Sequence, residues 1–236
     1  MTKLNPFLTC LWLLLEFVVI FGLWYLLKIA LDVSIWRYSG PVSLAIMLVL
    51  LFFYLRWRGH SFSWVGLVPL KSAKNWLLLL PQILLAMIAM GAIGAGLNFA
   101  GETLGLEFMK PDLAATENRF GDLAGNTSLY LTWLAIIWFA GPAEELFFRG
   151  FMIGQLRDIF GHSRWATALS IIIPAILFGA GHMYYQGLRG LIITGGVAVS
   201  LGILFVLYKR NIWPLAAAHA AINSLSFTAM YLQLDI

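Results

Sequence analysis

Three short stretches in the second half of the chain carry polar side chains that could do chemistry within otherwise apolar sequence. A carboxylate next to an imidazole can share a proton near neutral pH, which suits the pair to activate water as a general base. Imidazole and amide N–H groups can stabilise an oxyanion. The stretches are "GPAEELFFRG" with Glu144, Glu145 and Arg149, "LFGAGH" with Phe178 and His182, and "HAAIN" with His219 and Asn223.

The spacing within each stretch indicates which side chains act together on a helix. Glu145 and Arg149 are four residues apart, so they share a helix face and can form an ion pair. Glu144 is rotated by about 100° from Glu145 on a helix, so the two carboxylates need not have the same role. His219 and Asn223 are again four apart and point the same way, as are Phe178 and His182.

The three stretches match, in order, the motifs EExxxR, FxxxH and HxxxN. Between about Leu129 and Leu232 the chain therefore resembles the CAAX-protease and bacteriocin-processing (CPBP) family, the Rce1-like or abortive-infection family of intramembrane endopeptidases. The resemblance implies a hydrolase, a CAAX protease active in intramembrane proteolysis. By motif position Glu144 and His182 would activate a water that attacks a peptide carbonyl. His219 and Asn223 would stabilise the oxyanion, and Glu145, Arg149 and Phe178 would support the site.

The resemblance leaves open whether the enzyme is a glutamic protease or a metalloprotease. Glu144, His182 and His219 would form an acceptable His₂Glu ligand set for catalytic zinc. If Glu144 bound zinc, it could no longer act as the general base. Glu145 is better placed to pair with Arg149 than to replace Glu144 in that role. No HExxH motif is present. We therefore favour catalysis without a metal or other cofactor and keep zinc as the alternative.

The composition predicts an integral membrane protein. Hydrophobic residues make up 61% of the 236 residues and charged residues 11%, against about 25% charged in soluble domains. The sequence predicts an all-α, polytopic transmembrane bundle, and a net charge of +4 requires no nucleic-acid partner. About seven spans are expected: Phe7–Leu27, Pro41–Leu55, Trp76–Ala100, Leu129–Phe148, Trp165–Gly181, Leu191–Tyr208 and Trp213–Leu232.

The chain divides at the start of the motif region. Residues 1–128 are expected to hold N-terminal spans and an outer loop, and residues 129–236 the catalytic core. Lysine and arginine concentrate in the loops that would be cytoplasmic if the N-terminus is cytoplasmic, as the positive-inside rule requires. We expect a multi-pass protein of the bacterial inner (plasma) membrane. These basic residues are Arg56, Arg58, Lys71, Lys74, Arg157, Arg164, Lys209 and Arg210.

Counting along the spans places one motif residue at the wrong depth. Glu144 lies about 22 Å from the outer end of its span, and His219 about 9 Å from the inner end of its own. His182 lies about 25 Å from the inner end. The three can meet only if the fifth span starts well inside the aqueous phase, or if Pro142, Pro174 and nearby glycines bend the helices. The site is then expected to open toward the inner face.

The expected function is cleavage of a membrane-associated peptide or a lipidated protein, with a CAAX-type prenylated protein as one candidate substrate. The bilayer is the other expected partner. The alternative is a non-catalytic scaffold or bacteriocin-immunity protein on the same fold. Placing four polar groups within the membrane costs free energy, and a binding protein has no need for all of them. Their presence therefore favours the enzyme; the groups are Glu144, His182, His219 and Asn223. Glu16, in the first span, is expected to be structural.

Overall fold

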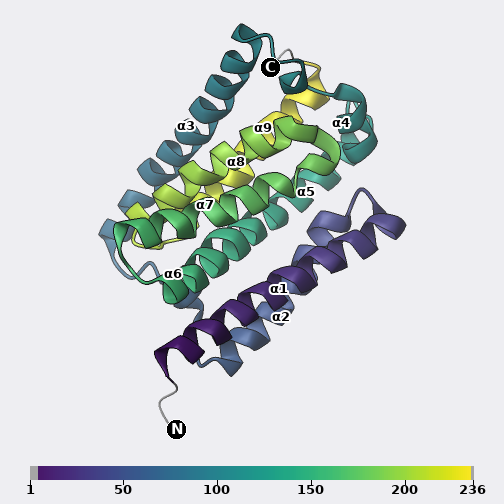
Figure 1. Cartoon of the computed structure of the whole chain (residues 1–236). Helices are drawn as coiled ribbons and strands as arrows, with labels where there is room; N and C mark the ends of the chain where they lie inside the picture. The colour runs from purple at the N-terminus through teal and green to yellow at the C-terminus, as the bar shows by residue number, and fades with distance from the viewer. Residues whose placement is uncertain (1–4, 235–236) are drawn as a thin grey trace.

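The computed structural model describes residues 5–234, and these residues form helices and connecting turns without a strand (Figure 1). This confirms the predicted all-α class. The elements are α1 (Pro6–Ile35), α2 (Ser39–Trp57), η1 (Phe62–Val65), α3 (Ala73–Thr103), η2 (Glu107–Met109), α4 (Leu113–Phe120), α5 (Thr127–Glu144), η3 (Glu145–Ile153), α6 (Gly154–Phe160), α7 (Arg164–Ala180), α8 (Met183–Leu207) and α9 (Trp213–Leu232).

Each of the seven expected spans lies along a helix to within one residue. Among the described residues, α1, α2, α3, the stretch Thr127–Phe160 and α8 are long and apolar enough to cross a membrane. α7 is a shorter apolar helix, and the 20 residues of α9 have the length of the hydrocarbon core, about 30 Å. The protein is a multi-pass membrane bundle. Its two ends lie at opposite ends of the bundle (Figure 1), as an odd number of crossings requires.

The outer surface of the bundle is apolar. Large hydrophobic side chains of α1 and α3 are exposed, among them Phe7, Leu26, Leu77 and Phe99. In water such a surface would favour aggregation, but acyl chains solvate it at no cost. Among the helices that carry the three motifs, α5 packs on α9 and α7 packs on α8.

The sequence suggested that the fourth span ends at Phe148, but the helix continues beyond this residue. α5, η3 and α6 form one continuous helical stretch from Thr127 to Phe160, which ends at Gly161 with φ 88°. Its 34 residues correspond to about 50 Å, well beyond the hydrocarbon thickness of about 30 Å. α7 starts after this extended end and packs back along α6 and η3, so its last turn returns to the level of Glu144. The depth mismatch of His182 is thereby resolved.

Two glycines explain why this helix continues where the sequence suggested a break. A side chain at Gly150 would collide with the backbone carbonyl of Val65 in η1, and one at Gly154 would collide with the Arg210 guanidinium and press on Trp64. The glycines therefore let the connection after α2 pack against the helix. The segment η3 itself is π-helical, a widened form that is often found at functional sites.

The α1–α2 hairpin is attached to the catalytic core through Glu16. Its Oε2 accepts hydrogen bonds from the Tyr54 hydroxyl at 2.7 Å and from Gln155 Nε2 at 3.3 Å, and Arg58 Nε lies 3.6 Å away. These partners come from α2, α6 and the turn that follows α2. The expectation that Glu16 is structural agrees with these contacts.

Candidate active site

The ion pair that the spacing predicted is present at the start of η3. Arg149 Nη1 lies 3.0 Å from Glu145 Oε1, and both side chains are buried, with 2% and 0% of their surface exposed. The contact is a charge–charge contact and not a well-aligned hydrogen bond, because Glu145 Oε2 and both Arg149 terminal nitrogens lack hydrogen-bond partners within the described chain. A buried pair of this kind is costly to break because either partner alone would be an uncompensated charge.

His219 lies between the two glutamates. Its Nδ1 donates to Glu145 Oε1 at 2.8 Å, and its Nε2 lies 3.5 Å from Glu144 Oε2. α9 can bring the imidazole this close because α5 has no side chain at Gly141, where a Cβ would lie 3.2 Å from the Ala220 backbone nitrogen. Arg149, Glu145, His219 and Glu144 therefore form a row in which each carboxylate contacts a cation or an imidazole.

His182 follows the last turn of α7 and has one ring nitrogen fixed. Its Nδ1 lies 2.8 Å from the Phe178 carbonyl oxygen. A carbonyl oxygen can only accept, so Nδ1 carries the proton and Nε2 of the neutral ring is a free acceptor. This is the tautomer that a water-binding base requires.

The Phe178 ring connects the parts of the site. Its centroid lies 4.7 Å from that of His182 and 6.3 Å from that of His219, and the Arg149 guanidinium lies 4.7 Å from the ring centroid. Phe148 contacts the same ring edge-on at 4.8 Å. Phe178 thus separates the two imidazoles and covers the buried cation.

The structure brings together six of the seven residues singled out from the sequence, and one contact differs from the expected one. The imidazole recorded next to Glu144 belongs to His219, whereas the motif roles paired Glu144 with His182. Asn223 lies one turn after His219 on α9, is partly buried, and makes no side-chain hydrogen bond within residues 5–234. The sequence also missed that Glu145 holds His219. The two are 74 residues apart, and no spacing rule relates positions so distant in sequence.

The ligands of the zinc alternative are not gathered into one site in the described part of the chain. Within residues 5–234, no three His, Cys, Asp or Glu side chains are grouped as metal ligands, so Glu144, His182 and His219 do not form the ligand set written above. The Nδ1 atoms of both histidines face protein oxygens, so Nε2 is the nitrogen that each ring could offer to a metal or to water.

Comparison with known proteins agrees with the motif analysis. The family model for "Type II CAAX prenyl endopeptidase Rce1-like" matches residues 126–225. This range contains all three motifs and every residue of the row around His219, so the resemblance is confirmed for that part of the chain. Neither a curated protein nor a solved structure matches the chain.

Proposed function

We propose that the chain, whose residues 126–225 match a family of membrane-embedded proteases, is an intramembrane endopeptidase. Its substrate is a membrane-associated or lipidated protein, and the nucleophile is a water activated by Glu144 and His182. The observation that supports this proposal best is that His219 contacts both Glu144 and Glu145 while its ring and that of His182 lie beside the Phe178 ring, all within the matched range.

The first step is the attack of water on the scissile carbonyl. His182 Nε2 accepts a hydrogen bond from the water, and the Glu144 carboxylate, which is 21% exposed, removes its proton as oxygen bonds to carbon. Glu145 is unsuited to this task because it is fully enclosed and already contacts Arg149 and His219. General-base help of this kind contributes about 10²–10⁴-fold to a rate.

The second step is the collapse of the tetrahedral intermediate. Negative charge on the former carbonyl oxygen is stabilised by the Nε2–H of His219 in its imidazolium form, whose Nδ1–H stays on Glu145, and by the amide N–H of Asn223; both residues lie on one face of α9. Glu145 keeps the His219 ring oriented, and Arg149 balances the charge of Glu145. Glu144 then returns its proton to the departing nitrogen as the C–N bond breaks, so the base is regenerated.

An apolar groove next to the site suits a lipidated or hydrophobic substrate. The groove has a volume of about 610 Å³ and lies between α2, η1 and α5. Leu146 of η3 lines it and follows Glu145 directly in the sequence, so the groove borders the helical segment that carries the carboxylates. The η1 side of the groove is at the end of the bundle where the N-terminus lies, which is the expected inner side.

Peptide cleavage by the purified protein in lipid nanodiscs tests the proposal. A panel of prenylated, acylated and unmodified peptides is expected to include one that is cleaved, with turnover reduced about 100-fold or more by Glu144→Gln and by His182→Ala. Glu107→Gln is the matched control, because this exposed carboxylate pairs only with Lys110. Cleavage that survives both substitutions would end the proposed mechanism. Binding of a peptide without any cleavage would instead favour the scaffold or immunity alternative.

A further inference from the structure

The apolar groove between α2, η1 and α5 adjoins a smaller pocket that carries polar side chains. The smaller pocket has a volume of about 110 Å³ and shares three lining residues with the groove: Phe52, Leu55 and Phe62. Its other lining residues, which we call the basic mouth of the groove, are Arg56, His60 and Ser61. The groove itself is lined by hydrophobic side chains. A ligand that fills both spaces would therefore need an apolar chain with a polar end.

Arg56 supplies the positive charge of the basic mouth. It is exposed, and no ion pair with it is present within residues 5–234. The charge of Arg58 is partly balanced by Glu16, 3.6 Å away. Burial lowers the pKa of His60, and the positive charge of Arg58 lowers it further, so this ring is neutral at pH 7 and can donate an N–H. A cation, an imidazole N–H and the Ser61 hydroxyl are groups that fit a phosphate.

The depth of the basic mouth matches the level of lipid headgroups. Trp57, the last residue of α2, follows Arg56 and is 67% exposed, and exposed tryptophans are typical of the membrane–water interface. From Leu55 the groove extends back to Ala45, about 15 Å along α2 and toward the acyl-chain region. The mouth lies at the end of the bundle that holds the N-terminus (Figure 1). We predict that this end is cytoplasmic, and the cytoplasmic leaflet is the one with a negative surface potential.

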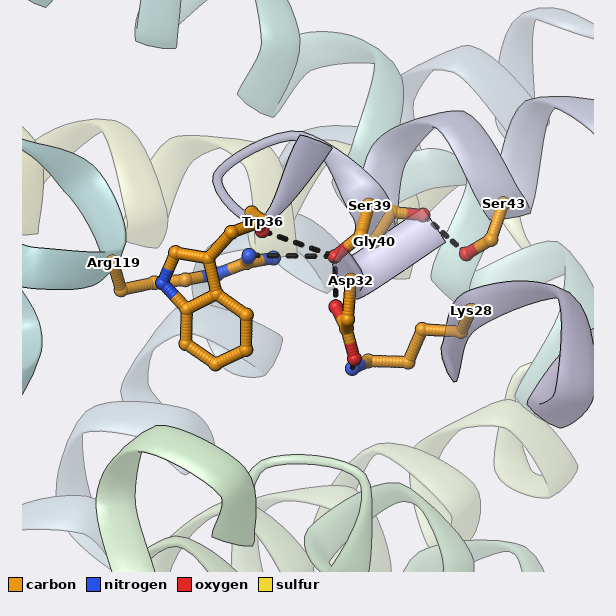
Figure 2. Close-up of polar contacts among 7 residues, drawn as sticks. All are labelled: Lys28, Asp32, Trp36, Ser39, Gly40, Ser43 and Arg119. Carbon is orange, nitrogen blue, oxygen red and sulfur yellow. Dashed lines mark hydrogen bonds and ion pairs between the residues drawn. The ribbon is translucent and has the colours of Figure 1, made fainter. Parts of the chain in front are cut away.

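The buried charges at the other end of the α1–α2 hairpin offer no comparable site. Lys28 pairs with Asp32 at 2.7 Å, and the Arg119 guanidinium donates to Ser39 Oγ at 3.4 Å (Figure 2). Only 4% of Arg119 is exposed, and Arg119 is electrostatically coupled to Glu144, so its charge already has a partner in the candidate active site. A lipid phosphate has no access to this group, whereas the basic mouth faces the surface.

We infer that the groove and its basic mouth bind an anionic phospholipid, with the phosphate at the mouth and one acyl chain along α2. Acyl chains are as apolar as the lining side chains, so a chain that enters the groove gains contacts without losing solvation. The positive charge of the mouth selects an anionic headgroup. A second part of the inference rests on the proposed function: the acyl chain occupies the groove that suits the apolar tail of a lipidated substrate, so lipid and substrate compete.

Lipid binding to the full-length protein in detergent micelles, measured by native mass spectrometry, tests the first part. The protein is titrated with phosphatidylglycerol and with phosphatidylcholine that has the same acyl chains. We expect phosphatidylglycerol to bind about fivefold more tightly, the contribution of one arginine near an anionic headgroup. Arg56→Gln should remove this preference. Ala45→Phe, which fills part of the groove, should weaken the binding of both lipids.

Lys74→Gln is the matched control, because this exposed lysine lies at the start of α3 and outside the basic mouth. It should keep the preference of the wild type. Equal loss of the preference in Lys74→Gln and Arg56→Gln would show a general attraction to basic residues and overturn the site. Equal binding of the two lipids by the wild type would overturn it as well. So would displacement of the lipid by soluble glycerol phosphate at equal concentration, because a small-anion site does not use the groove.

Cleavage of a lipidated peptide without net charge tests the competition. In nanodiscs, replacing phosphatidylcholine by phosphatidylglycerol should raise KM about fivefold for wild type and Lys74→Gln, but not for Arg56→Gln, with kcat within about twofold. An unchanged KM, or an equal rise in all three proteins, would contradict competition for the groove.

The binding measurement separates this inference from the proposed function. If no peptide is cleaved while the preference for phosphatidylglycerol still depends on Arg56, the protease proposal fails and the lipid site stands. If a peptide is cleaved but the wild type binds the two lipids equally, the lipid site fails alone.

Discussion

At the scale of single residues, two neighbouring glutamates have different surroundings and hence different expected roles. Glu144 is 21% exposed and has one neighbour at 3.5 Å, whereas Glu145 is fully buried between Arg149 and His219. The π-helical segment η3 begins at Glu145, so the helix changes its geometry between the two glutamates. A reactive base needs access to water, and a structural anion needs fixed partners.

Substitution of Glu145 is expected to affect stability much more than substitution of Glu144. Glu145→Gln leaves Arg149 buried without a counterion, which costs about 3–5 kcal/mol. Glu144→Gln should cost less than about 1 kcal/mol, as for a partly exposed site. Denaturant unfolding in detergent micelles measures both. The double change Glu145→Leu with Arg149→Met should recover most of the loss in stability while activity stays absent. A larger loss for Glu144→Gln would contradict this division of roles.

Chelation is expected to leave the enzyme active. Glu144, His182 and His219 are not grouped as metal ligands in the described chain, and the proposed base is the Glu144 carboxylate itself. Cleavage rates measured before and after extended dialysis against a strong chelator should agree within about twofold. Loss of activity that added zinc restores would support the zinc alternative, with the histidines turning their Nε2 atoms to the ion.

At the scale of the elements, the site depends on close contacts between helices at glycine positions. A Cβ at Gly179 would lie 2.6 Å from the Leu191 backbone oxygen and 3.0 Å from the backbone of Gly195. α7 and α8 can therefore pack only with hydrogen at this position. His182 follows three residues later, so the position of its ring is set by this contact.

Gly179→Ala should force α7 and α8 apart and move His182. Backbone shifts from overpacking typically cost about 1–3 kcal/mol, and a displacement of about 1 Å at a catalytic group can cost about 100-fold in rate. Gly91→Ala on α3 is the control, because a Cβ there meets nothing within 4 Å. Thermal unfolding and cleavage rate are measured for both variants. Equal effects of the two substitutions would argue against the packing explanation.

The sequence predicted which helices form more accurately than it predicted where each helix ends. Long apolar runs were enough to place seven helices. The continuation of the motif helix from Phe148 to Phe160 could not be predicted, because Gly150 and Gly154 resemble helix breakers as long as their packing partners are unknown. These partners are Val65 for Gly150, and Arg210 and Trp64 for Gly154. The motifs predicted that His182 and His219 lie near the glutamates. They could not predict that His219 contacts both carboxylates, because this contact depends on how α9 packs against α5.

At the scale of the whole molecule, the termini lie at opposite ends of the bundle (Figure 1), and basic residues gather in the loops of the N-terminal end. From the positive-inside rule we predict that this end faces the cytoplasm. Reporter fusions in bacterial cells should show a cytoplasmic N-terminus and a C-terminus on the outer side. Two reporters on the same side would require an even number of crossings.

The position of His219 on α9 has a consequence for biosynthesis. The ribosome delivers both glutamates, Arg149 and His182 before α9 emerges, so an incompletely translated chain has the carboxylates but not the ring that Glu145 holds. Under the proposed mechanism, proteolytic competence is therefore expected only once α9 has entered the bilayer. We expect a nascent chain that still lacks α9 to be inactive.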